Sequence, residues 1–212
     1  QTNLHALNML FLNALIEQYG QLGGLQANAN ALKSEFQNLN SQAYSGYSVE
    51  IFEQYTNLVT DLRNLLVAIG DDSNLTLDPD LDTFYLMDYL IFKAHNTAEA
   101  YGVLRGKGSG IIASASYSTK HLVPFAQILG SANGDATHGA LTSVITSNAS
   151  LSSELSGVVS NLKSSQNSFS VEIYRIIEEN SASVSSTEFF ALGTSAIDVI
   201  YDGVGTVDEL LK

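Results

Sequence analysis

Apolar residues recur at alternating intervals of three and four along much of the chain, a spacing that places them on one face of an α-helix. Three such seams are clear: Ile51, Tyr55, Leu58, Leu62, Leu65 and Ile69; Leu141, Val144, Asn148, Leu151, Leu155, Val158 and Leu162; and Phe190, Gly193, Ile197, Ile200, Val204, Val207 and Leu211. Seams of this kind are typical of helices that pack against other helices. The pattern therefore predicts an all-α fold.

Turn-forming residues divide the chain into helices of unequal length. The predicted helices lie near 2–43, 47–70, 79–112, 118–130, 136–179 and 187–211. The first would be a rod of about 60 Å at 1.5 Å per residue, and the last would begin with Ser186 or Thr187 as its N-cap. These lengths favour an elongated antiparallel helical bundle, with two stacked four-helix modules that share long helices in one domain over 1–212.

Charge and residue content exclude several classes of function. The chain carries 9 basic and 22 acidic residues, a formal net charge of -13, so it offers no basic face to nucleic acid. It contains no cysteine, which excludes disulfides, thiolate metal sites and cysteine nucleophiles. No apolar run reaches the roughly 18 residues that a membrane span needs. Because the chain begins and ends within helical patterns, at Leu4 and Leu211, we expect it to be excised from a longer protein.

Motifs for catalysis or metal binding fail on spacing. The segment 78–89 begins like a calcium loop, but Thr83 stands where glycine is required and Tyr89 where a bidentate glutamate is required. The segment Gly102–Gly108 has one residue too few for a phosphate loop and lacks Ser or Thr after its lysine. The histidines are far apart in sequence: His5, His95, His121 and His138. We therefore expect no enzyme activity, cofactor or metal.

One predicted helix carries a carboxylate on its apolar stripe. Asp88 follows Phe84 by four residues and precedes Ile91 by three, which places it on the side that should face a core. Burying an unpaired carboxylate costs several kcal/mol, roughly, so a partner is required. The full stripe is Leu81, Phe84, Asp88, Ile91, His95, Ala98, Gly102 and Arg105.

Two interpretations of this stripe remain open. In the first, polar side chains face a cavity between helices and hold a small ligand, with an arginine meeting any carboxylate. The candidate ligand-binding residues are Arg63, Tyr85, Asp88, His95 and Arg105. In the second, Asp88 pairs with a neighbouring helix, His95 is a satisfied core histidine and Arg105 complements a helix end. An amine or uncharged ligand would instead favour the tyrosines Tyr85, Tyr89 and Tyr101.

Three blocks of sequence resemble the periplasmic sensor region of bacterial methyl-accepting chemotaxis proteins. They are 73–88 (SNLTLDPDLDTFYLMD), 104–108 (LRGKG) and 189–194 (FFALGT), the last followed by Ile197-Asp198 and Leu210-Leu211. The similarity covers most of the chain from residue 70 onward and is weak in the first 45 residues. Similar sensors also precede histidine kinases and diguanylate cyclases, so the output domain is left open.

The resemblance implies a helical-bimodular ligand-binding domain between two transmembrane helices. Such a domain is the periplasmic part of a cytoplasmic (inner) membrane protein and works as a homodimer. It binds a small metabolite, organic acids among them, between helices of one bundle. In signal transduction for chemotaxis, the final helix would pass a shift of about 1 to 2 Å into the membrane. The rival is a structural coiled-coil spacer or adhesin-like helical protein, for which the seams alone suffice.

Overall fold

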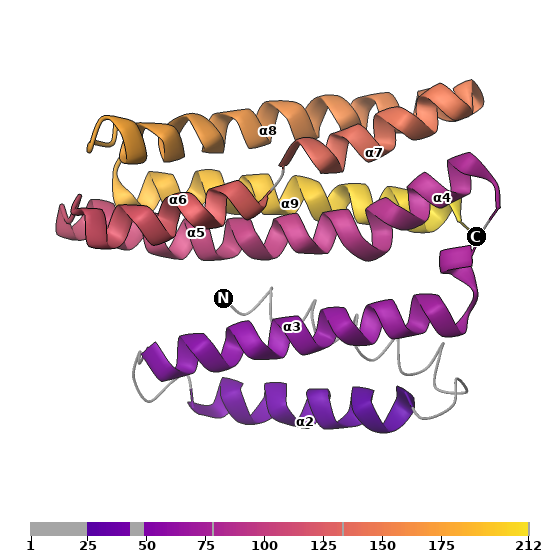
Figure 1. Ribbon diagram of the computed structural model, residues 1–212, viewed down its shortest axis with the longest axis horizontal. Helices are drawn as coiled ribbons and strands as arrows, with labels where there is room; N and C mark the ends of the chain where they lie inside the picture. Colours follow the sequence, from indigo (N-terminus) through magenta and orange to yellow (C-terminus); the bar gives the residue numbers. More distant parts are fainter. Residues whose placement is uncertain (1–24, 43–48, 78, 133, 212) are drawn as a thin grey trace. The chain divides into compact units, whose positions relative to one another are not determined.

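The computed structural model describes residues 25–42, 49–77, 79–132 and 134–211, and every regular element in these ranges is helical (Figure 1). The predicted all-α bundle is confirmed. The chain divides into two compact units, residues 1–77 and 78–212. Each described helix lies within one unit, so long helices shared between modules are not found among the described residues. None of these helices is both long enough and apolar enough to cross a bilayer.

The N-terminal unit contains a helical hairpin. Helices α2 (Leu25–Gln42) and α3 (Val49–Asp72) pack on each other, and a 3₁₀ turn (Leu75–Leu77) follows. The buried residues are Ala29, Leu32, Leu39, Leu58, Leu65 and Ile69. The last three belong to the seam that predicted this helix. The part of the predicted 2–43 helix before residue 25 lies outside the described residues.

The C-terminal unit is a bundle of four antiparallel rods joined by short turns (Figure 1). The first rod joins α4 (Leu81–Met87), a π-helical turn (Asp88–Lys93) and α5 (Ala94–Ser114). The second joins α6 (Thr119–Ala132) to α7 (Gly134–Ser147). The third is a 3₁₀ turn (Ala149–Leu151) with α8 (Ser152–Glu178), and the fourth is α9 (Ser186–Leu210).

The prediction of one helix over 136–179 is wrong, because the chain breaks at Asn148. This residue has extended backbone angles, and its side-chain oxygen accepts hydrogen bonds from Ser150 N at 3.1 Å and Ser150 Oγ at 2.6 Å. Its amide nitrogen donates to Asp82 Oδ2 in α4 at 2.7 Å. Asn148, the one polar residue in the seam from Leu141 to Leu162, is therefore a helix cap between α7 and the 3₁₀ turn that precedes α8.

A left-handed residue ends α5. Ala115 has φ 48°, Ser116 N donates to Ile111 O at 3.0 Å, and Ala115 N donates to Ile112 O at 3.2 Å. These two bonds form a Schellman motif, in which glycine usually holds the left-handed position. The motif reverses the chain so that α6 returns beside α5 (Figure 1).

A capping box starts α9. Ser185 Oγ accepts from Glu188 N, and the Glu188 carboxylate accepts from Ser185 N at 2.8 Å. The N-cap is thus Ser185 and not Ser186 or Thr187 as predicted. The preceding loop is held by the buried Glu172 of α8, whose carboxylate accepts from the Ser183 backbone at 3.1 Å and hydroxyl at 2.5 Å.

Glycines let large side chains approach the backbones of α5 and α9. Phe189 of α9 lies against Gly108 of α5, and Tyr89 reaches Gly203 of α9. A β-carbon at either glycine would overlap the aromatic side chain. The Tyr89 hydroxyl also donates to Ile200 O at 2.9 Å. These contacts fix the axial register of α5 against α9.

Candidate functional site

Asp88 does not lie unpaired in the core. Its side chain is 21% exposed, and Oδ1 is 3.8 Å from Lys93 Nζ. The two residues are five apart, a spacing that would place them on different faces of an α-helix. In the π-helical turn the hydrogen bonds run from i to i+5, which brings both side chains to one side. Lys93, in the same π-helical turn, is therefore the charged partner of the Asp88 carboxylate.

His95 and Arg105 both contact α9. The His95 ring lies 5.7 Å from the Tyr201 ring, measured between centroids. Arg105 Nη1 donates to Thr194 Oγ1 at 2.8 Å, and the guanidinium lies 4.4 Å from the centroid of the Phe190 ring. Desolvation lowers the pKa of Arg105 from its usual value, while the nearby charge of Asp198 acts in the opposite direction. Arg105 thus joins two helices.

The predicted ligand residues do not converge on one cavity. Tyr85 packs edge-on against Phe84 with 5.6 Å between centroids. Tyr85 and Arg105 are separated by about 30 Å of nearly continuous helix at 1.5 Å per residue, so one small ligand cannot touch both. Arg63 is partly buried in α3, a helix of the other unit.

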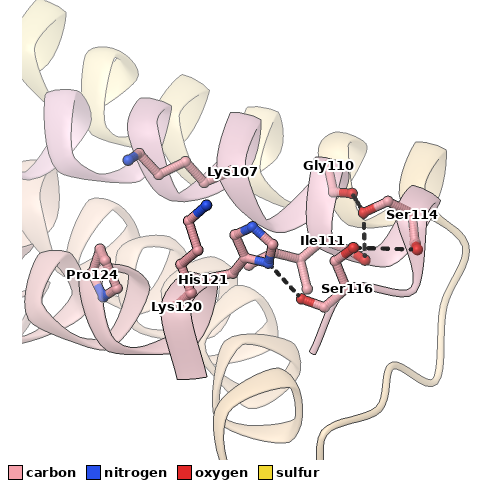
Figure 2. Close-up of a pocket in the computed structure, with 8 residues that line it drawn as sticks. All are labelled: Lys107, Gly110, Ile111, Ser114, Ser116, Lys120, His121 and Pro124. Atoms are coloured by element: carbon pink, nitrogen blue, oxygen red, sulfur yellow. Dashed lines mark hydrogen bonds between the residues drawn. The ribbon is translucent and has the colours of Figure 1, made fainter. Parts of the chain in front are cut away.

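A pocket with a volume of about 250 Å³ lies at the corner between α5 and α6. Its lining includes Lys107, Ser114, Ser116, Lys120 and His121. Lys107 comes from α5 and Lys120 from the first turn of α6, and the Schellman motif at Ala115 brings these helix ends together. Figure 2 shows both lysine side chains at the same end of the pocket, with the His121 ring between Lys120 and Ser116.

Hydrogen bonds fix the orientation of His121. Its Nδ1 lies 3.1 Å from the Ser116 carbonyl oxygen and 3.2 Å from Ser118 Oγ. A carbonyl oxygen can only accept, so Nδ1 carries a proton. The second ring nitrogen, Nε2, is left for the pocket side of the ring (Figure 2).

The pocket is positive in a strongly acidic chain. Two of the 9 basic residues line it, whereas none of its described lining residues is among the 22 acidic ones. Neither Lys107 nor Lys120 forms an ion pair with a described residue. The arrangement can attract and hold a negatively charged group.

The pocket lies beside an aromatic junction that joins the four rods. Gly108, next to Lys107, contacts Phe189 of α9 and Phe125 of α6. Phe189 is 5.1 Å from Phe169 of α8 between ring centroids, and Phe169 is 5.4 Å from Tyr101 of α5. Lys107, which lines the pocket, is thus next in sequence to Gly108, which contacts Phe189 at the start of α9.

A second hollow of about 340 Å³ lies between α8 and α9. Its described lining is uncharged: Asn161, Ser164, Ser165, Ser168, Leu192, Ser195 and Val199. Ser165 Oγ and Ser195 Oγ approach to 3.4 Å across it. Because it offers no charge and few convergent donors, it is the weaker candidate.

Sequence reasoning missed the α5–α6 pocket. In the sequence, Lys107 belongs to a segment that fails as a phosphate loop, and His121 is far from the other histidines. The signal in the sequence was the placement of two of the few lysines near the ends of the predicted helices 79–112 and 118–130 that follow each other. Within the described residues, no group of three or more His, Asp or Glu is arranged to hold a metal ion.

Comparison of the chain with protein-family models, with curated proteins and with solved structures finds no match.

Proposed function

We propose that this chain is the extracytoplasmic sensor domain of a bacterial transmembrane chemoreceptor, which binds a small metabolite and transmits a helix displacement across the membrane. The observation that carries the proposal is the position of the α5–α6 pocket, next to the contacts of Gly108 with Phe125 and Phe189. A ligand in this pocket would act directly on the residues that position the start of α9.

Two of the sequence blocks that resemble chemoreceptor sensors also meet in space. Block 104–108 supplies Arg105 and Gly108, and block 189–194 supplies Phe189, Gly193 and Thr194. Arg105 crosses Gly193 and donates to Thr194, while Phe189 lies on Gly108. The resemblance therefore falls on residues that form one helix–helix contact, which supports a shared structural origin over chance similarity.

The mechanism is a shift between two arrangements of the bundle. A ligand that binds one arrangement more tightly increases its population, by no more than its differential affinity for the two. The pocket spans the end of α5 and the beginning of α6, so occupancy would bias how these ends lie against Phe189. The resulting displacement of α9 relative to α8 would pass into a following membrane helix, in a homodimeric receptor of the inner membrane.

A melting-temperature screen tests for a ligand. The panel contains organic acids, amino acids and amines, and a binder at one hundred times its dissociation constant should stabilise the fold by about 2.7 kcal/mol. A flat response across the panel would favour the structural spacer. As a site test, Lys120→Gln should reduce the response to an anionic hit, while Lys163→Gln on the exposed face of α8 should leave it intact.

Distance measurements test the transmission step. Since the chain has no cysteine, spin labels can be attached at Asn167→Cys of α8 and Gly205→Cys of α9, both exposed positions. We expect the label-to-label distance to change by about 1 to 2 Å on saturation with a ligand found in the screen. Equal distances in the free and saturated protein would contradict the sensor proposal.

A further inference from the structure

We infer that the α5–α6 pocket is an anion site that takes a small molecule with two negative charges, a dicarboxylate or a phosphate group. The inference rests on the proposed function only for the claim that this is the sensory site. Its own basis is the pair of lysines on different helices, which face one pocket and have no described carboxylate partner.

The charge of the whole chain makes these lysines informative. The chain has 22 acidic residues against 9 basic ones, yet no acidic residue is among the described lining of this pocket. Lys93 and Arg175 do form ion pairs, with Asp88 and with Glu172 and Glu179. Lys107 and Lys120, both exposed, instead line one pocket from two different helices (Figure 2).

The serine hydroxyls of the pocket already donate hydrogen bonds within the protein, so the lysine side chains are the donors for a ligand. Ser114 Oγ already donates to Gly110 O at 2.7 Å, and Ser116 Oγ donates to Ser114 O at 3.4 Å. Each lysine ammonium offers three donors. A dianion uses both ammonium groups, whereas a monoanion leaves one unneutralised.

The volume limits the size of the ligand. The 250 Å³ of the pocket equals the liquid volume of about eight water molecules at about 30 Å³ each. This lies below the range of roughly 300 to 1,000 Å³ that is typical of sites for drug-sized ligands. The site therefore suits a metabolite of a few carbons or an inorganic anion.

Isothermal titration of the 1–212 protein tests the inference with four probes: succinate, inorganic phosphate, acetate and uncharged succinamide. We expect at least one dianion to bind, acetate to bind at least about tenfold more weakly, and succinamide to show no binding. Binding should weaken as salt is raised. Succinate binding without phosphate binding identifies a carboxylate site, and the reverse identifies a phosphate site.

Variants locate the site. Lys107→Gln and Lys120→Gln should each raise the dissociation constant of the bound dianion about tenfold or more, and Lys163→Gln on α8 should leave it unchanged. Circular dichroism checks that each variant is folded. The inference is overturned if neither dianion binds below about 10 mM, or if both glutamine variants bind as the Lys163→Gln control does.

Failure of this inference and failure of the proposed function give different results. If an amine or neutral metabolite stabilises the protein and moves the α8–α9 labels while both dianions fail, the anion site is wrong and the sensor proposal stands. If a dianion binds through Lys107 and Lys120 without moving the labels, the anion site stands and the sensor proposal fails.

Discussion

Gly193 of α9 lies directly against Arg105 of α5. A β-carbon built at Gly193 would be 2.8 Å from Cβ and 2.9 Å from Cγ of Arg105, and 3.0 Å from the Phe169 ring. The absence of a side chain at this position lets the arginine cross the helix and reach Thr194 and Phe190. The contact joins the two helices whose ends surround the aromatic junction.

Replacing this glycine should destabilise the bundle. Gly193→Ala forces Arg105 or Phe169 to move, and overpacking of this kind costs about 1 to 3 kcal/mol. Gly205→Ala on the same helix is the matched control, because a β-carbon there meets nothing within 4 Å. The control should be neutral or stabilising by up to about 1 kcal/mol, since alanine favours helix. Urea unfolding measures both, and equal effects would contradict the packing described.

The Schellman turn predicts a stabilising substitution. Ala115→Gly should raise the free energy of unfolding by about 1 kcal/mol, because an L-residue with a side chain is strained at φ 48°. The same change two residues earlier, Ala113→Gly, falls within α5 and should lower it by about 0.5 to 1 kcal/mol. Thermal melts of the two variants should therefore shift in opposite directions. A lower melting temperature for Ala115→Gly would contradict a left-handed residue at this corner.

Tyr101 should make the fold sensitive to alkali. Burial raises the pKa of Tyr101 to about 12, from about 10 in the unfolded chain. Because the folded pKa is the higher one, this contribution to stability is complete below pH 10 and is lost as the pH rises through 12. Tyr101→Phe should therefore gain about 2 kcal/mol relative to the wild type between pH 9 and pH 12. Denaturant unfolding at the two pH values measures the gain, and a constant difference would contradict the burial.

Replacing Asn148 by aspartate should lower the free energy of unfolding by an amount that depends on pH. The hydrogen bond from Asn148, followed by one from the Thr83 backbone, lowers the pKa of Asp82. The stability that the fold gains from this lowered pKa is present above about pH 4 and is lost as the pH falls through the pKa of Asp82 in the folded protein. Asn148→Asp keeps a capping oxygen but sets two carboxylates face to face, so its penalty should be larger at pH 7 than at pH 3. Asn148→Ser, which caps without charge, should show a smaller difference between the two pH values.

The helical seams predicted the fold, because packing repeats along many residues. The segment predicted as 79–112 is helical from Leu81 to Ser114, and Leu58 and Leu65 are buried as their spacing indicated. The break at Asn148 was missed, since the seam continues in phase on both sides of it and leaves Val144 and Leu155 fully buried. A short turn can preserve the face of a seam while ending the helix.

The candidate site was harder to predict, because it depends on local departures from regular helix. Asp88 was placed by a 3.6-residue period, and a single π-helical turn pairs it with Lys93, five residues later. The pocket depends on where α6 returns beside α5, which is set by the left-handed Ala115. Alanine gives no sequence signal for that conformation, so the meeting of Lys107 with Lys120 could not be derived from spacing.

The glycine contacts at Gly108, Gly193 and Gly203 have a mechanical consequence for the bundle. Each holds a side chain from the opposite helix, so α9 cannot slide along α5 unless Phe189, Arg105 and Tyr89 all leave their positions at once. The next equivalent register is a full helical turn away, about 5.4 Å. A piston-like motion of α9 along α5 therefore requires these three side chains to repack together.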